Sequence, residues 1–172
     1  YSASRGMEQV QIDLKAEEGK AAFMRLAEKA DVVIESFRPG VVGRLGIDYE
    51  VINKINPRII YCATSGVGQD GPHSPWAGHD VNYLAAGGFL GCTAKGEHGV
   101  PPLPGGTIAD SAGGGMHAVI AVMAALVNRE KTGKGEYLDV SIADGVLSFM
   151  ALYVDQYLAT DHEVGPETAM LT

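Results

Sequence analysis

The chain has 172 residues, 46% of them hydrophobic, and a formal net charge of −8 at pH 7. This length and composition suffice for a buried core, and a negative net charge without a cluster of Lys and Arg argues against a nucleic-acid partner. Cys62 and Cys92 lack disulfide and metal-ligand patterns, and the histidines lack the spacing of a metal site, so we expect no metal and a cytoplasmic location. The chain opens without a signal-peptide apolar run, and its longest apolar run, 118–127, is about half of the ~20 residues of a bilayer span, so we expect a soluble protein without a membrane partner.

The N-terminal part of the chain alternates predicted strands and helices. Its apolar spacing predicts a strand over 9–14, a helix over 17–30, a buried strand over 31–35, a short helix from Pro39 through Leu45, a helix capped by Asp48, and a buried strand over 58–64. This order predicts an α/β fold, a parallel sheet covered by helices. Arg38 follows the strand over 31–35, at the carboxyl edge where ligands bind in open α/β sheets.

Residues 65–77 form a loop rich in Gly and Pro that contains a misleading motif. Gly66-Val67-Gly68-Gln69-Asp70-Gly71 matches the dinucleotide fingerprint G-x-G-x-x-G and follows a predicted strand. Pro72 and Pro75 forbid the helix whose N-terminus would hold the pyrophosphate. The context therefore disfavours a nucleotide cofactor.

His79 and Asp110 each sit at a predicted turn-to-helix junction. Gly78 precedes the histidine, and Gly105-Gly106-Thr107 precedes the aspartate, so the backbone can turn sharply before each side chain. The start of a helix carries unpaired N–H groups, and those at the Asp110 helix are candidates for stabilising an oxyanion on a substrate. Taken alone, a histidine at the start of a helix is more often a solvated or hydrogen-bonded residue than a catalytic one, and the aspartate indicates an ordinary helix cap.

The remaining elements are a loop over 91–107, a long helix from Asp110 to about Lys131, a strand over 136–142, a helix from Asp144 onward, and ten final residues that resemble a linker. The long helix opens with Gly113-Gly114-Gly115, and interior glycines cost roughly 1 kcal/mol each relative to Ala. We therefore expect a ligand or a neighbouring helix to approach closely there. The helix is then predicted to bury an apolar stripe: Met116, Val119, Ile120, Met123, Leu126 and Val127.

Four stretches together resemble one enzyme superfamily: Ser36-Phe37-Arg38-Pro39-Gly40, the run from Ser65 to Pro72, Ala109-Asp110-Ser111, and the run from Arg129 to Gly135. As a set they resemble the class III CoA-transferase and α-methylacyl-CoA racemase superfamily, in the right order over nearly the whole chain. The resemblance implies a Rossmann-like large domain, a smaller second domain, and two subunits that interlock as a homodimer.

The resemblance also implies a domain division. Residues 1–142 would form part of the CoA-binding large domain, and residues 143–172 a helix and the start of a linker toward a small domain. The family's first βαβ unit would precede Tyr1, and its small domain would follow Thr172.

Two chemistries share this superfamily, and both use the position of Asp110. In the transferases the matching aspartate attacks the acyl-CoA thioester and later carries CoA as an aspartyl thioester to a new carboxylic acid. Gly78-His79-Asp80-Val81-Asn82-Tyr83 is similar to the racemase motif, in which the histidine and the later aspartate form a pair of bases. A thioester acidifies its α-hydrogen, and inversion needs one group on each face of that carbon.

We therefore expect an acyl-CoA racemase with His79 and Asp110 as its catalytic residues and an acyl-CoA thioester as its substrate. The resemblance implies no cofactor beyond the CoA moiety of the substrate. Arg38, Tyr83 and Asp80 are the candidates for binding that moiety, and Asp80 is also similar to a residue that supports the histidine. The alternatives are a CoA-transferase with Asp110 as nucleophile, and a non-catalytic dimerisation or CoA-binding module.

Overall fold

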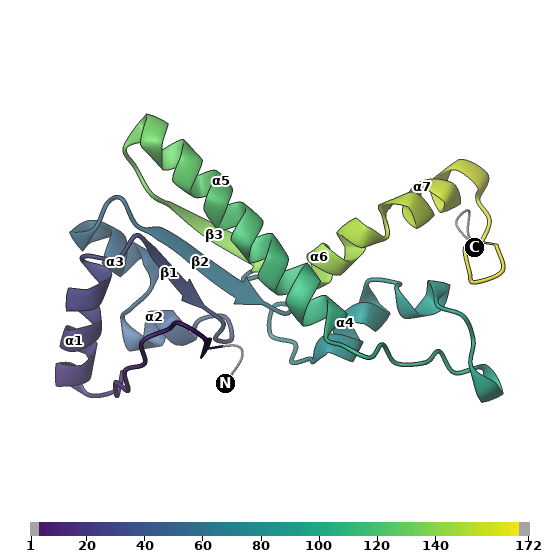
Figure 1. Ribbon diagram of the computed structural model, residues 1–172, viewed down its shortest axis with the longest axis horizontal. Coiled ribbons are helices and arrows are strands. Elements are labelled where there is room, and N and C mark those ends of the chain that lie inside the picture. The colour runs from purple at the N-terminus through teal and green to yellow at the C-terminus, as the bar shows by residue number, and fades with distance from the viewer. Residues whose placement is uncertain (1–3, 169–172) are drawn as a thin grey trace.

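The computed structural model describes residues 4–168 and is built on a parallel three-stranded sheet (Figure 1). The strands β1 (Val32–Glu35), β2 (Ile60–Ser65) and β3 (Glu136–Ser141) lie in the order β1-β2-β3. Ile60 pairs with Val32 on one side and with Glu136 on the other. β2 is almost wholly buried, as expected for a central parallel strand. The predicted α/β fold is confirmed.

One face of the sheet is covered by α1 (Glu17–Ala27) and α3 (Tyr49–Ile55). Tyr61 and Ile59 of this face pack with Ala27 of α1 and Ile52 of α3. The short helix α2 (Val41–Leu45) connects β1 to α3. As predicted, Asp48 caps α3, and its Oδ1 accepts a hydrogen bond from the Val51 N–H at 3.0 Å.

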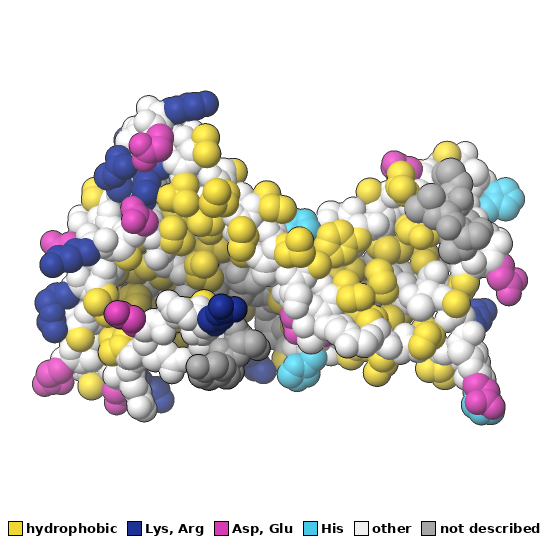
Figure 2. Space-filling model, viewed as in Figure 1, with side chains coloured by type: hydrophobic (Ala, Val, Ile, Leu, Met, Phe, Trp, Pro, Cys, Tyr) yellow, Lys and Arg dark blue, Asp and Glu magenta, His cyan; other side chains and the backbone are white. Residues whose placement is uncertain are grey.

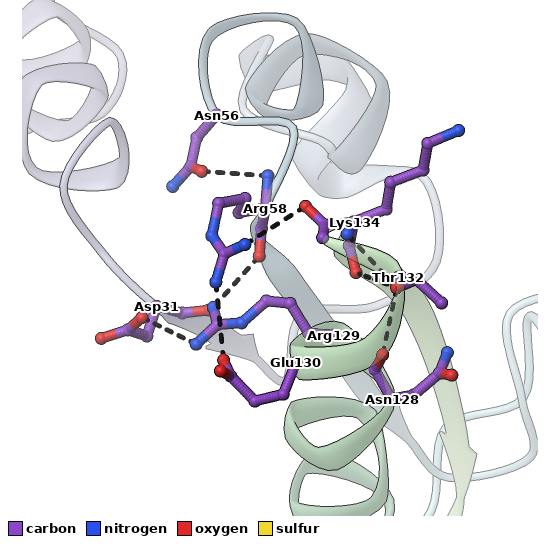
Figure 3. Close-up of polar contacts among 9 residues, drawn as sticks. Asp31, Asn56, Arg58, Asn128, Arg129, Glu130, Thr132 and Lys134 are labelled. Carbon is purple, nitrogen blue, oxygen red and sulfur yellow. Dashed lines mark hydrogen bonds and ion pairs between the residues drawn. The ribbon is translucent and has the colours of Figure 1, made fainter.

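The other face of the sheet is covered by α5 (His117–Thr132). Small side chains on this helix allow its backbone to lie close to the strands, and Ala118 packs with Cys62 and Val140. Near the end of the helix the guanidinium of Arg129 is buried between segments (Figure 3). It donates to the carbonyl oxygens of Asp31 and Arg58 at 3.2 and 3.1 Å and to Oδ1 of Asp31 at 2.9 Å. Arg129 therefore joins the helix to the residues that lead into β1 and β2.

A group of helices beyond the carboxyl edge of the sheet positions the candidate site. They are α4 (Asp80–Ala86), the π-helix η4 (Ala109–Met116), which continues directly into α5, and α6 (Ile142–Phe149). Leu84, Ala109 and Val146 are each fully buried and form their common core. The final helix α7 (Ala151–Thr160) and the short 3-10 turns η2 (Leu90–Cys92) and η3 (Glu97–Gly99) extend from this group. In Figure 1 it lies beside the sheet, on the opposite side from α1 and α3.

Two of the three glycines at the start of the long helix, Gly113 and Gly114, allow another part of the chain to approach the helix closely, as the cost of glycines inside a helix predicted. A Cβ on Gly113 would lie 2.8 Å from the carbonyl oxygen of Ile142, and one on Gly114 would lie 2.9 Å from the Ile142 side chain. Gly115 has more room, since its nearest neighbour would be the carbonyl oxygen of Asp110 at 3.6 Å. The close neighbour is therefore α6, which packs directly against η4.

Two local predictions are wrong. Residues 9–14 form no strand, because alternation alone does not supply the hydrogen-bonded neighbour that a strand requires, and Val10 is exposed. The helix predicted from Asp144 is two helices, α6 and α7, separated at Met150. Of the predicted linker, residues 163–168 form no helix or strand, and residues 169–172 lie outside the described part of the chain.

The predicted burial of the α5 stripe is also wrong for this chain. Most of its bulky members are about 60% exposed: Met116 62%, Val119 61%, Ile120 63%, Met123 58% and Val127 59%. The sheet takes the opposite, alanine-rich side of the helix, because periodicity shows that a helix has an apolar stripe but not which neighbour covers it. Figure 2 shows hydrophobic side chains gathered over this region.

The continuous helical run Ala109–Thr132 is long and apolar enough, by length and composition alone, to cross a membrane. The 18-residue stretch of this run that meets the test has a mean hydropathy of 1.4, and 28% of that stretch is buried. In the fold it packs along β2 and β3, and it carries Arg129 on its buried side. Its position is that of a helix covering the sheet of an α/β domain.

Candidate active site

A pocket of about 300 Å³ opens at the carboxyl edge of the sheet. Arg38 lines it from the segment after β1, and Ser65 lines it from the end of β2. Trp76, His79 and Tyr83 close the other side. Arg38, from the segment after β1, is therefore brought to one cavity with His79 and Tyr83, at the edge where open α/β sheets bind ligands, whereas Asp80 and Asp110 are not among the residues that line it.

His79 is the N-cap residue of α4 and lies exposed at the pocket. Its backbone is extended, with φ −127° and ψ 173°, and its N–H donates to Oδ1 of Asn82 at 2.9 Å. The bond fixes the junction between loop and helix, so the imidazole projects from a defined backbone. The predicted turn-to-helix position of His79 is confirmed.

Asp110 stands in the first turn of η4, and its backbone N–H donates to Oδ1 of Asp80 at 2.8 Å. The contact joins the starts of two helices that are 30 residues apart in the sequence. Asp110 is an exposed residue, and partial desolvation of its carboxyl, with the negative charge of Asp80, raises its pKa, while the nearby His79 partly opposes this shift. Asp110, Asp80 and His79 thus form one electrostatically coupled group.

Three of the backbone N–H groups around Asp110 are already bound and are therefore not free oxyanion donors. The Asp110 N–H is bound to Asp80, the Ile108 N–H to the carbonyl oxygen of Gly106 at 3.0 Å, and the Ser111 N–H to the carbonyl oxygen of Thr107 at 2.9 Å. A helix start leaves unpaired donors only where neighbouring groups do not satisfy them. Here the preceding loop and a distant carboxylate do so.

Tyr83 lies in a slot formed by two glycines. A Cβ on Gly78 would lie 2.9 Å from its ring, and one on Gly66 would overlap its hydroxyl. Its pKa is raised by burial and by the charge of Asp110, while a hydrogen bond from the Gly78 backbone and the charge of Arg38 act in the opposite direction. The phenol therefore lies within the electrostatic reach of Asp110 and Arg38.

Arg38 is exposed at the pocket and forms no ion pair with any of residues 4–168. A guanidinium without a protein carboxylate is suited to bind an anionic group of a ligand. A second pocket of about 600 Å³ adjoins the first and shares Trp76, Ala77 and Tyr83 with it. Apolar side chains such as Val67 and Ala86 line it.

The comparisons with known proteins agree with these observations. The model of the family described as CoA-transferase family III matches residues 1–170. The chain belongs to CoA-transferase family III. It is 42% identical to acetyl-CoA:oxalate CoA-transferase of Acetobacter aceti over 147 residues, which are 86% of this chain and 38% of that protein. It is 40% identical to the human alpha-methylacyl-CoA racemase over 142 residues, 82% of this chain and 37% of that protein.

Solved structures of the family share the fold as well. A CAIB/BAIF family protein from Brucella suis is 36% identical and superposes with a TM-score of 0.88, covering 93% of this chain and 42% of that one. The chain therefore spans about two-fifths of the length of the relatives that it matches. Family membership confirms the resemblance found in the sequence motifs, and the relatives include both transferases and racemases.

Trp76 and Ser65 are among the residues of the pocket to which the sequence motifs assigned no role. Trp76 is 62% exposed, and its ring lies 4.0 Å from that of His73 between centroids, tilted by 38°. The loop that holds both residues carries no periodic signal from which this could be predicted. Ser65 ends a buried strand, where only its polar type distinguishes it from its apolar neighbours. Within residues 4–168 no three His, Cys, Asp or Glu side chains gather as a metal site would require. Residues 66–79, which include the G-x-G-x-x-G stretch, contain no helix, as Pro72 and Pro75 predicted.

Proposed function

We propose that this chain carries the proton-transfer site of an acyl-CoA racemase, which inverts the α-carbon of a 2-methylacyl-CoA thioester. The observation that supports it is the hydrogen bond from the Asp110 N–H to Oδ1 of Asp80 at 2.8 Å, which holds the start of η4 against the start of α4, where His79 is the N-cap. Inversion requires two groups that can exchange a proton with opposite faces of one carbon. An imidazole and a carboxyl of raised pKa meet that need.

The two residues exchange roles between the two directions. In one direction the neutral His79 imidazole removes the α-proton, the electron pair moves into the thioester to form an enolate, and the protonated Asp110 carboxyl returns a proton to the opposite face. In the other direction the Asp110 carboxylate removes the proton, and the imidazolium of His79 returns one. Partial desolvation and the charge of Asp80 favour the protonated carboxyl, because both raise its pKa.

The CoA moiety is proposed to bind through Arg38, Tyr83 and Asp80. Arg38 would pair with a phosphate of CoA, Tyr83 would line the passage beside the thioester, and Asp80 would act by holding the Asp110 backbone. The adjoining apolar pocket offers room for the acyl group. No further cofactor and no metal is included in this mechanism.

The active protein is proposed to be a cytoplasmic, interlocked homodimer, as the family resemblance implies. The exposed apolar face of α5 supports this arrangement, because a contiguous patch of large apolar side chains is typical of an interaction surface. A second copy of the chain is the proposed occupant.

A CoA-transferase is the alternative, favoured by the 42% identity to a protein named as an acetyl-CoA:oxalate CoA-transferase. The Asp110 carboxylate would attack the thioester carbonyl and expel CoA as a thiolate, which leaves a mixed anhydride. The thiolate would then attack the aspartyl carbonyl to give an aspartyl-CoA thioester and the free acid, and a second acid would reverse these steps. In this reaction His79 is dispensable.

One experiment separates the two reactions. The full-length protein is incubated in deuterated water with a 2-methylacyl-CoA and a different carboxylic acid, and every thioester is followed by mass spectrometry. Deuterium at the α-carbon without a new thioester supports the racemase, and His79→Ala and Asp110→Asn should each abolish the exchange. A new thioester without α-deuterium, unaffected by His79→Ala, would overturn it in favour of the transferase.

A further inference from the structure

Removal of an α-proton places negative charge on the thioester oxygen, and that oxygen needs a hydrogen-bond donor. The backbone N–H groups of Ile108, Asp110 and Ser111 are all bound within the protein. A side chain that faces the pocket beside His79 can supply the donor instead.

Tyr83 is in the right place. It lies four residues after His79, one turn into the same helix, and both side chains line the same pocket. Asp110 and Arg38 both act electrostatically on its phenol. Tyr83 therefore shares the pocket with His79 and Arg38, and its phenol lies within the electrostatic reach of Asp110.

The slot around Tyr83 also acts on its hydroxyl. A hydrogen bond from the Gly78 backbone lowers the pKa of the phenol, against the effect of burial. A donor that itself receives a hydrogen bond is polarised and binds an oxyanion more strongly. Gly66 and Gly78 allow the Tyr83 ring to lie directly against the backbone, because a side chain at either position would collide with it.

We propose that the Tyr83 hydroxyl donates a hydrogen bond to the carbonyl oxygen of the bound thioester and stabilises the enolate oxygen during proton transfer. This inference rests on the proposed racemase function. It assigns Tyr83 a catalytic contact in addition to its place beside the CoA moiety. The hydroxyl keeps its proton throughout, and the proton moved in the reaction passes only between the α-carbon, His79 and Asp110.

Tyr83→Phe tests this proposal, since it removes the oxygen and keeps the ring that fills the slot. In the full-length protein, kcat for α-deuterium exchange into a 2-methylacyl-CoA should fall by about 10- to 100-fold, with KM changed less than about threefold. Tyr157→Phe, at an exposed tyrosine of α7, is the matched control and should leave both constants unchanged. Replacement of Tyr83 by 3-fluorotyrosine, which retains a more acidic hydroxyl, should preserve kcat.

Each other outcome decides between the alternatives. A Tyr83→Phe protein with wild-type kcat would overturn the donor role and leave the racemase intact. A rise in KM at constant kcat in Tyr83→Phe would assign the hydroxyl to substrate binding and overturn the proposal. A fall in kcat in the 3-fluorotyrosine protein as large as that in Tyr83→Phe would assign the hydroxyl to the position of the loop and overturn it as well. Absence of exchange in the wild-type protein would instead refute the racemase itself, and the enolate contact with it.

Discussion

Arg129→Ala should destabilise the fold far more than the loss of a surface arginine. Arg129 is 7% exposed and holds the carbonyl oxygens of Asp31 and Arg58 at 3.2 and 3.1 Å (Figure 3). Each of these bonds contributes about 1 kcal/mol, and the packing of the aliphatic stem contributes about 1 kcal/mol more. The ion pair with Asp31 adds only about 0.5 kcal/mol, because that carboxylate is 79% exposed.

One opposing contribution lowers this sum. The Nε of Arg129 is buried without a hydrogen-bond partner among residues 4–168, and its removal restores about 1 kcal/mol. The expected net loss is therefore about 2 to 3 kcal/mol in the free energy of unfolding. For a chain of this size that corresponds to a fall in Tm of roughly 4 to 12 °C.

Urea unfolding followed by circular dichroism measures this loss, and Arg58→Ala is the matched control. Arg58 forms an ion pair with Glu130 at 3.5 Å, but the two side chains are 53% and 74% exposed, so its removal should cost less than about 1 kcal/mol. Arg129→Lys keeps the charge without the planar fork and should fall between the two variants. Equal losses for Arg129→Ala and Arg58→Ala would refute the role of Arg129 as the link between α5 and the strands.

Three further variants test other parts of the structure. Gly66→Ala would bring a Cβ within 2.6 Å of the Tyr83 ring and should lower kcat for exchange by about 10-fold or more. Gly105→Ala, at a glycine with open space around it, should leave kcat unchanged, and equal kcat values for the two variants would contradict the tight slot around Tyr83. Asp110→Asn should raise Tm at pH 7, because a carboxyl whose pKa is raised in the folded protein makes the fold less stable once it ionises. The gain in Tm should vanish below pH 3.8, the ordinary pKa of the group, and a gain that persists there would show another cause. Ile120→Glu with Met123→Glu should convert the full-length protein to monomers in sedimentation experiments, whereas the exposed control Val10→Glu should not; a dimer that survives the double change would exclude this face as the interface.

The candidate site was partly predictable. His79 and Asp110 were found because glycines before each side chain, and helical patterns after it, are local signals that a sequence carries directly. Arg38 was found because it follows a buried strand, so its place at the sheet edge follows from the parallel topology. The bond from the Asp110 N–H to Asp80 could not be predicted, because it depends on how two helix starts meet across 30 residues.

By itself, the sequence determined the parallel α/β fold, the absence of a helix after the G-x-G-x-x-G stretch, and the close approach at Gly113 and Gly114. The first two features depend on the conformational preferences of short segments, which each stretch of residues carries wherever it lies. The glycines indicated a close approach because of their cost inside a helix, but not that α6 is the neighbour. Only the tertiary structure decided which side of α5 faces the sheet, which backbone donors remain free, and that Tyr83 shares a pocket with Arg38 and His79. Those features depend on which distant surfaces meet, because a buried face or a satisfied hydrogen bond is defined by its partner as much as by the residue itself.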